Sequence, residues 1–194
     1  MSETGVVKFQ FEHVARELRE FHQLDELNRC RERLLQRGWM GVDENGIGFG
    51  NISVRAEESS AFYVTATGTG GHRTLALEDL AKVTAYQFER NWLRCEGAVA
   101  SSESLTHAAV YEANAAARAV IHCHAPGLWT RLLHVAPTTS GAVEYGTPEM
   151  ATEVRRLFAT TDLADEKIFV MAGHKDGIVS FGATLAEALA ALDR

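Results

Sequence analysis

The sequence predicts an α/β fold in which helices pack on a largely antiparallel sheet. Short apolar or alternating runs typical of strands recur along the chain, and several of them are joined by tight turns. Segments with helical spacing lie between these runs. No linker or repeat interrupts the 194 residues, of which 46% are hydrophobic. We therefore expect one domain, residues 1–194, with a sizeable core.

The first half of the chain is expected to begin with a long helix and to continue with strands. Residues 10–37 carry apolar side chains at helical spacing, and Gly38 is a plausible stop for this helix. Strand patterns then follow at residues 51–55, 61–65, 83–88 and 92–95. The last two of these flank residues 89–91, which predicts a hairpin.

The second half alternates between helices and strands. Thr147 and Pro148 have the form of an N-cap followed by proline at the first helical position, opening a helix that runs to about residue 158. Thr184 and Glu187 form a capping-box pattern for the last helix. The remaining predicted elements are helices at 105–114 and 127–134 and strands at 119–123, 167–171 and 177–181.

Composition and charge limit the partners and the cellular compartment that the protein can be expected to have. The net charge of -7 is spread along the chain without a basic stripe, which argues against nucleic acid or a membrane surface as the main partner. Three cysteines without framework spacing suit a reducing compartment. The first residues lack the pattern of a secretory leader, and no apolar run is long enough to span a bilayer. We therefore expect a soluble, cytoplasmic protein.

Two histidines one residue apart lie in the apolar run 119–124. On a strand, His122 and His124 point to the same face and Cys123 to the other. Two buried imidazoles are costly unless a partner compensates them, and a divalent metal does so directly. A third candidate, His174, lies in a turn-like stretch, and three neutral imidazoles leave positions open on zinc, as in catalytic sites. The alternative is that these are ordinary residues with hydrogen-bonded rings.

A second constellation lies at residues 101–104, where two serines and Glu103 stand at the start of a predicted helix. Hydroxyls and unpaired backbone N–H groups at a helix N-terminus form an anion site. The alternative is a plain N-cap, with Glu103 as a favourable charge on the helix dipole. Asn51 and the pair Thr67–Gly68 also have the composition of ordinary turns. For His107 we expect a core or capping role.

Taken in order, these segments resemble the class II aldolase/adducin family, and most of all its L-fuculose-phosphate aldolases. The resemblance runs from about residue 22 to the end of the chain. It rests on an ordered set of motifs at residues 50–55, 65–68, 101–103, 122–124 and 174. It implies a three-layer α/β/α fold with a central, mostly antiparallel sheet.

The resemblance also implies roles for individual residues. His122, His124 and His174 would hold a zinc ion, with Mn²⁺ or Co²⁺ as other candidates, and Glu103 would be the catalytic acid/base. The positions that hold the substrate phosphate in the sugar-phosphate enzymes are matched by Asn51, Thr67, Gly68, Ser101 and Ser102.

The implied activity is that of a metal-dependent aldolase, a carbon–carbon lyase. It would cleave or form a small sugar phosphate, or a related hydroxy-ketone, through a zinc-stabilised enediolate. The implied assembly is a homotetramer with active sites at subunit interfaces. Two alternatives remain: a pentulose-phosphate 4-epimerase or methylthioribulose-phosphate dehydratase of the same family, and a non-catalytic module like the adducin head.

The chain departs from the aldolase pattern in several places, including a shorter stretch between His124 and the helix start at residues 146–149. The stretch 136–141 has no tyrosine where those enzymes place a proton-donating one, and Tyr145 aligns better with the start of the following helix. Gly48 stands where some relatives have a hydroxyl residue that helps to hold phosphate. These departures leave the predicted metal ligands and Glu103 in place, but they do not name the substrate.

Overall fold

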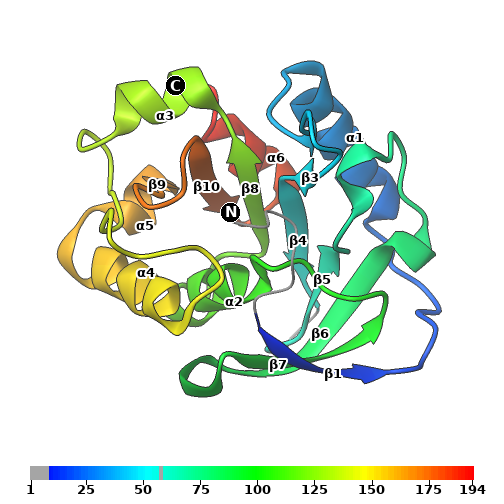
Figure 1. Ribbon diagram of the computed structural model, residues 1–194. Helices are drawn as coiled ribbons and strands as arrows, with labels where there is room; N and C mark the ends of the chain where they lie inside the picture. The colour runs from blue at the N-terminus through cyan, green and yellow to red at the C-terminus, as the bar shows by residue number, and fades with distance from the viewer. Residues whose placement is uncertain (1–8, 57–58) are drawn as a thin grey trace.

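The computed structural model describes residues 9–56 and 59–194 and is built on an eight-stranded sheet (Figure 1). The strand order is β1-β7-β6-β5-β4-β8-β10-β9. Neighbouring strands are antiparallel except β1 and β7, which run parallel. The strands are β1 (Gln10–Val14), β4 (Asn51–Arg55), β5 (Phe62–Thr65), β6 (Leu80–Gln87), β7 (Trp92–Gly97), β8 (Ala119–His124), β9 (Ile168–Val170) and β10 (Gly177–Gly182).

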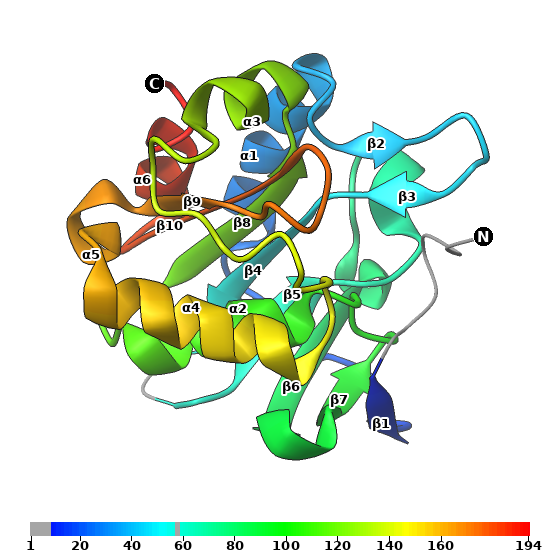
Figure 2. The same ribbon diagram turned by 60° about the vertical axis from the view of Figure 1, so that its left-hand side comes forward.

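Helices cover both faces of this sheet, so the predicted α/β/α layering is confirmed (Figure 2). One hydrophobic cluster joins the sheet to α2 (Ser104–Ala113), α4 (Pro148–Thr160) and α5 (Leu163–Glu166). The other joins it to α1 (Leu24–Gln36), α3 (Pro126–Leu132) and α6 (Leu185–Ala190). Two apolar sheet faces, each buried by helices, are the condition under which such a layered fold is stable.

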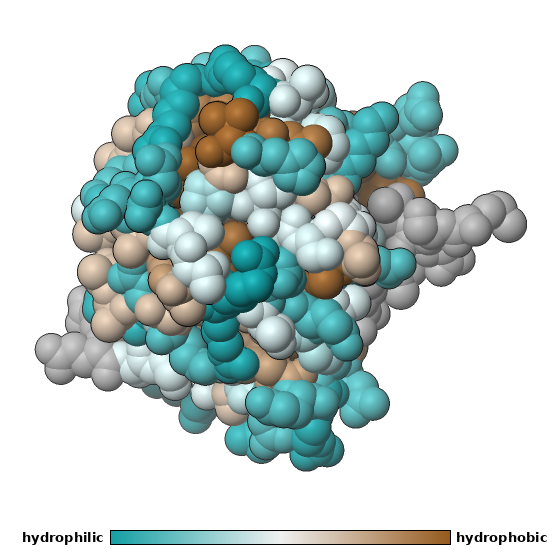
Figure 3. Space-filling view, turned by 90° about the vertical axis from the view of Figure 1, so that its left-hand side faces the viewer, coloured by the Kyte–Doolittle hydropathy of each residue, from teal (hydrophilic) through white to brown (hydrophobic). Residues whose placement is uncertain are grey.

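Smaller elements complete the structure. A two-stranded hairpin, β2 (Gly41–Val42) and β3 (Gly48–Phe49), projects beside the main sheet (Figure 2). Short 3₁₀ turns are η1 (Thr69–Gly71), η2 (Leu77–Asp79) and η3 (Phe88–Arg90). On the face seen in Figure 3, hydrophobic colouring is confined to small areas among hydrophilic side chains. No helix in the described part of the chain is long and apolar enough to cross a membrane.

The predicted helix over 10–37 is wrong in its first part. Gln10–Val14 forms strand β1, and the helix begins only at Leu24. The apolar spacing near residue 11 fits a helix, but β1 instead pairs along the edge of β7 with Gln10 opposite Trp92. Phe11 stays 42% exposed, so the spacing did not mark a buried face. Tertiary pairing overrode the local pattern here.

Most other elements agree with the sequence. Gly38 ends α1 with a φ of +68°, and η3 joins β6 to β7 as the predicted hairpin. Thr184 caps α6, because its hydroxyl accepts a hydrogen bond from the Glu187 N–H at 3.1 Å. Thr147 precedes Pro148 as predicted, but its hydroxyl donates to the Glu144 carbonyl at 2.8 Å and makes no cap to α4.

Candidate active site

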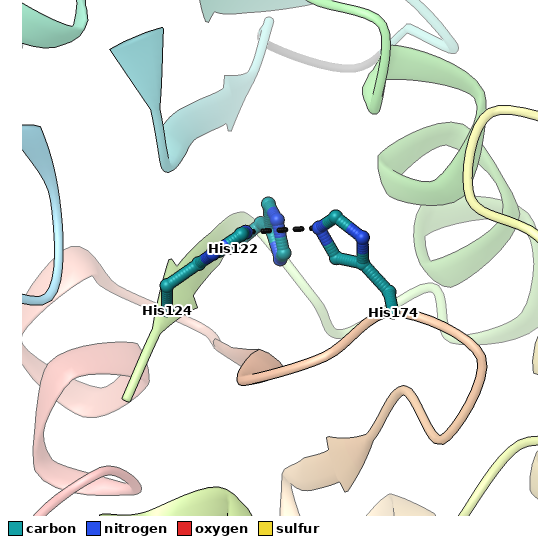
Figure 4. A group of neighbouring side chains, drawn as sticks. All are labelled: His122, His124 and His174. Atoms are coloured by element: carbon teal, nitrogen blue, oxygen red, sulfur yellow. Dashed lines mark hydrogen bonds between the residues drawn. The ribbon is translucent and has the colours of Figure 1, made fainter. Parts of the chain in front are cut away.

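The three predicted metal ligands converge in space (Figure 4). His122 and His124 lie on β8, and His174 lies in the turn before β10. Because β10 pairs antiparallel with β8, Gly177 stands opposite His124, and this register brings the turn to the end of β8. One ring nitrogen from each histidine lies within 4.8 Å of the other two. His124 Nε2 and His174 Nε2 lie 2.9 Å apart.

Strand alternation and a glycine orient these rings. Val120 packs in the cluster beneath α2 and α4, whereas Cys123 packs in the opposite cluster, so β8 turns Cys123 away from its two histidines as predicted. Gly177 allows the His174 ring to fold back over the turn, because a Cβ at this glycine would lie 2.6 Å from His174 Cδ2. A side chain at position 177 would therefore displace the ring.

The donor set fits a divalent cation. Zinc holds imidazole nitrogens at about 2.0–2.1 Å, which places two ligand nitrogens about 3.3 Å apart. The separation between His124 Nε2 and His174 Nε2 is 2.9 Å, and all three ligand nitrogens lie within 4.8 Å of one another. His122 Nδ1 lies 3.2 Å from the Ile178 carbonyl oxygen, so it carries the proton and leaves Nε2 for a metal. Burial, and then the neighbouring His174 and His124, lower the pKa of His122 well below 6.5. Burial also lowers the pKa of His124, so both rings offer lone pairs at neutral pH.

Glu103 lies in the same cavity as the histidines, at the residue that precedes α2. Its side chain is buried, with the residue only 3% exposed. One carboxylate oxygen, Oε2, accepts a hydrogen bond from the Thr106 hydroxyl at 2.8 Å. This bond fixes the carboxylate at the start of the helix, where the dipole favours negative charge.

The cavity has a volume of about 570 Å³ and is lined by all nine predicted catalytic, metal-binding and phosphate-binding residues. Such a volume suits a small ligand. The nine predicted site residues that line it are Asn51, Thr67, Gly68, Ser101, Ser102, Glu103, His122, His124 and His174.

Asn51 and Ser101 join the start of β4 to the start of α2. The Asn51 amide donates to the Ser101 hydroxyl at 3.0 Å, and both residues are buried. Ser101 Oγ is 3.5 Å from the Glu103 nitrogen, and the residue at the N-cap position of α2 is Glu103 itself. The serine hydroxyl is therefore tied to a strand residue in the cavity wall rather than acting as a plain N-cap.

Two glycine-containing loops form another part of the wall. Gly68 has a φ of +77°, which only glycine adopts easily. A Cβ on Gly70 would lie 2.2 Å from the Gly41 carbonyl oxygen and 2.5 Å from Gly48 Cα. A Cβ on Gly48 would in turn lie 3.0 Å from the Gly70 nitrogen. The hairpin and η1 thus meet backbone to backbone, and this contact explains why position 48 carries no side chain.

Sequence reasoning missed two aromatic residues of the cavity. The Tyr145 ring lies 4.2 Å from the His174 ring between centroids, and the Phe49 ring lies 5.2 Å from that of His124. Tyr145 was expected only at the start of α4, yet it also lines the cavity. Local spacing carries no signal for these contacts, because each joins segments far apart in the sequence.

His107 occupies the core position that was expected. It is fully buried, and its Nδ1 lies 2.7 Å from the Ser53 hydroxyl. The same hydroxyl is 2.7 Å from the Tyr111 hydroxyl. Burial lowers the pKa of His107 to about 3, so the ring is neutral at physiological pH. His107 therefore belongs to a buried polar network behind the cavity and is absent from its wall.

Comparison with known proteins identifies the family. Residues 25–193 match the family described as class II aldolase and adducin N-terminal domain. No curated protein matches the chain. An L-fuculose 1-phosphate aldolase structure has a TM-score of 0.66 and 18% identity, over 91% of this chain and 82% of that one.

Two further structures are similar at the level of the fold. The L-fuculose-1-phosphate aldolase of Thermus thermophilus has a TM-score of 0.62 and 21% identity, over 88% of this chain and 87% of that one. YgbL of Klebsiella pneumoniae has a TM-score of 0.65 and 22% identity, over 88% of this chain and 84% of that one. Its name leaves the reaction open between aldolase, epimerase and decarboxylase. The family match covers most of this chain, and the protein therefore belongs to the class II aldolase and adducin N-terminal domain family.

Proposed function

We propose that the protein is a zinc-dependent aldolase that cleaves or forms a small sugar phosphate or a related hydroxy-ketone. The observation that carries this proposal is the convergence of His122, His124, His174 and the buried Glu103 on one cavity. Three neutral imidazoles would leave one or two coordination positions for substrate oxygens. A purely structural or adapter role gives no reason to gather these side chains around a cavity.

The proposed site has a metal end, formed by the three histidines, and an anion end, formed by the predicted phosphate-binding residues. When bound, the cation supplies a Lewis acid that stabilises negative charge developing on the substrate oxygens. Glu103 would remove a proton from, or return it to, the substrate carbon beside those oxygens. Asn51, Thr67, Gly68, Ser101 and Ser102 would hold the phosphate away from the reacting bond. Anchoring both ends makes the chemistry effectively intramolecular.

Metal analysis of the purified protein tests the first half of the proposal. We expect about one zinc per chain in the wild type and loss of most of it in His124→Ala. The matched control is His22→Ala, which removes an exposed histidine that lies far from His122 in the sequence and should leave the metal content unchanged. Unchanged metal in His124→Ala, or none in the wild type, would contradict the assignment.

Product analysis tests the second half and separates the reactions that share this site. The assay offers dihydroxyacetone phosphate or dihydroxyacetone with a panel of aldehydes and follows carbon–carbon bond formation. We expect condensation with the phosphorylated ketone. Isomer formation from pentulose phosphates without condensation would favour an epimerase, and loss of water from a ribulose-phosphate derivative would favour a dehydratase. If the purified protein holds no stoichiometric metal and shows none of these activities, the result would favour the non-catalytic adducin-like module.

We also propose that residues 1–194 form one domain, that it assembles as a cytoplasmic homotetramer, and that a neighbouring subunit completes each cavity. The family resemblance supports the assembly. Analytical ultracentrifugation of the metal-loaded protein tests it, with a tetramer as the expected species. A monomer at micromolar concentration that retains full activity would refute the shared site.

A further inference from the structure

A guanidinium group is buried directly behind the cavity wall. Arg31 lies on α1 among Leu27, Cys30 and Leu34, and its residue exposure is 0%. Arginine stays charged in proteins, and a buried charge is costly unless it is compensated. Among the described ion pairs, none joins Arg31 to a carboxylate. Its hydrogen-bond acceptors are instead neutral, and the negative charge of Asp79 acts on the guanidinium only through space.

Those acceptors belong mainly to one loop. Arg31 Nε donates to the His72 carbonyl at 2.9 Å, and Nη2 lies 2.6, 2.8 and 2.7 Å from the carbonyls of Thr69, Gly70 and His72. Nη1 lies 2.9 Å from Met40 Sδ. One side chain therefore binds three carbonyl groups of this loop. Gly70 is also part of the cavity wall.

Apart from the three histidines, the described residues that line the cavity carry no positive charge. Within the described residues, no lysine or arginine lines it, whereas Asp43 and Glu103 do. An anion bound beside Thr67 and Gly68 would therefore depend on hydroxyls, amides and whatever charge lies behind the wall. Arg31 Nη2 lies 2.8 Å from the Gly70 carbonyl oxygen, and Gly70 lines the cavity, so the guanidinium charge lies close behind the wall. Attraction between such a buried charge and an anion is screened less than attraction between two charges in water.

We propose that Arg31 is a positioning residue for the anion end of the site: it locks the loop 67–72 in its binding shape and supplies the positive charge behind it. This inference rests on the proposed function, since it assumes a substrate that carries a phosphate or similar anion. Arg31 touches no substrate. It acts through the loop, and the geometry requires its fork of donors, which a lysine ammonium does not reproduce.

The test measures binding of inorganic phosphate to the metal-loaded protein by isothermal titration calorimetry. We expect Arg31→Met to weaken phosphate binding by about tenfold or more, and Arg31→Lys to restore only part of the loss, because a loop displaced by about 1 Å forfeits most of its binding geometry. Metal content should not change, since the histidines lie on β8 and its neighbouring turn. The matched control is Arg29→Met, which removes an exposed arginine from the same helix.

A variant with both serines replaced distinguishes failure of this inference from failure of the proposed function. If replacing both Ser101 and Ser102 with alanine leaves the affinity for phosphate unchanged, the assignment of the anion end is refuted, and the proposed role of Arg31 is refuted together with it. If the serine variant loses binding while folded Arg31→Met and Arg31→Lys bind as the wild type does, only the role of Arg31 is refuted.

A measurement on the wild type covers the case in which the Arg31 variants do not fold. The side-chain Nε–H resonance of Arg31 is followed by nuclear magnetic resonance during a phosphate titration. A saturable shift with the same dissociation constant as the calorimetric one supports the inference. No shift of this resonance while phosphate binds would overturn it.

Steady-state kinetics distinguish a positioning role of Arg31 from a role in fold stability alone. With the phosphorylated ketone, Arg31→Lys should raise KM severalfold more than it lowers kcat, and with unphosphorylated dihydroxyacetone it should match the wild type. A structural role alone would lower the activity toward both ketones in the same proportion.

Discussion

Replacing Gly70 with alanine tests whether the backbone contact between η1 and the β2–β3 hairpin shapes the cavity. The added Cβ would lie 2.2 Å from the Gly41 carbonyl oxygen, about 1.2 Å short of the 3.4 Å at which ordinary contact begins. It would also lie 2.5 Å from Gly48 Cα. Both atoms belong to backbone, so no side-chain rotation relieves the clash. The hairpin or the loop must move by about 1 Å.

The expected effect is large on binding and moderate on stability. A displacement of about 1 Å in a binding wall costs on the order of 10²-fold in catalytic efficiency. Overpacking of this kind destabilises a fold by about 1–3 kcal/mol, which most domains survive. The backbone of Gly70 does not have a positive φ, so alanine adds a steric clash without conformational strain.

The assay compares Gly70→Ala with the wild type in metal content, thermal unfolding and KM for the phosphorylated ketone. We expect full metal, a modestly lowered Tm and a KM raised by about 10²-fold. The matched control is Gly127→Ala on α3, where an added Cβ meets nothing within 4 Å. A folded Gly70→Ala protein with unchanged KM would refute the idea that this contact holds the binding wall in place.

Three further predictions concern Glu103, the serine pair and His107. Glu103→Gln should retain the metal and abolish exchange of the substrate carbon proton with deuterated water; retained exchange would assign the base elsewhere. Replacing Ser101 and Ser102 with alanine should raise KM about tenfold or more for the phosphorylated ketone only, and equal effects on both ketones would reject their role. Below pH 6.5 the unfolded chain binds a proton at His107, whereas the buried ring in the native state stays neutral down to about pH 3. The contribution of His107 to the free energy of unfolding is therefore complete above pH 6.5, and it falls by about 1.4 kcal/mol per pH unit between pH 6.5 and pH 3. Urea unfolding of His107→Gln should lack this part of the slope, and an unchanged slope would disprove the buried neutral ring.

The fold was predictable where local pattern and tertiary contact agree. The alternation in 119–124 placed His122 and His124 on one face, because β geometry leaves no other arrangement. Pairing of β1 with β7 could not be read from residues 10–14, whose apolar spacing fits a helix equally well. The partner strand lies some 80 residues away, and only the assembled sheet edge decides between the two conformations.

The residues with reactive or metal-binding groups could be predicted from the sequence, but the residues that hold them in position could be predicted less well. Residues with donor atoms are recognisable by type and order, whereas Tyr145 joins the cavity only through the path of a long loop. Arg31 offered one local signal: it shares the buried stripe of α1 with Leu27 and Leu34, where a charge is unexpected. Its carbonyl acceptors, on residues 69, 70 and 72, carry no sequence signature at all, since every residue has a carbonyl.

The two ends of the cavity are built from different elements and meet at one strand pair. Asn51 stands directly opposite His122 in the β4–β8 register, and its amide holds Ser101, two residues before Glu103. The spacing between the histidines and the serines is therefore set by sheet hydrogen bonds, which are among the least deformable parts of a fold. The loop 67–72, in contrast, depends on Arg31 and on glycine contacts outside the sheet. Metal retention and anion binding should consequently separate under mutation, because damage to the loop leaves the β4–β8 pair intact.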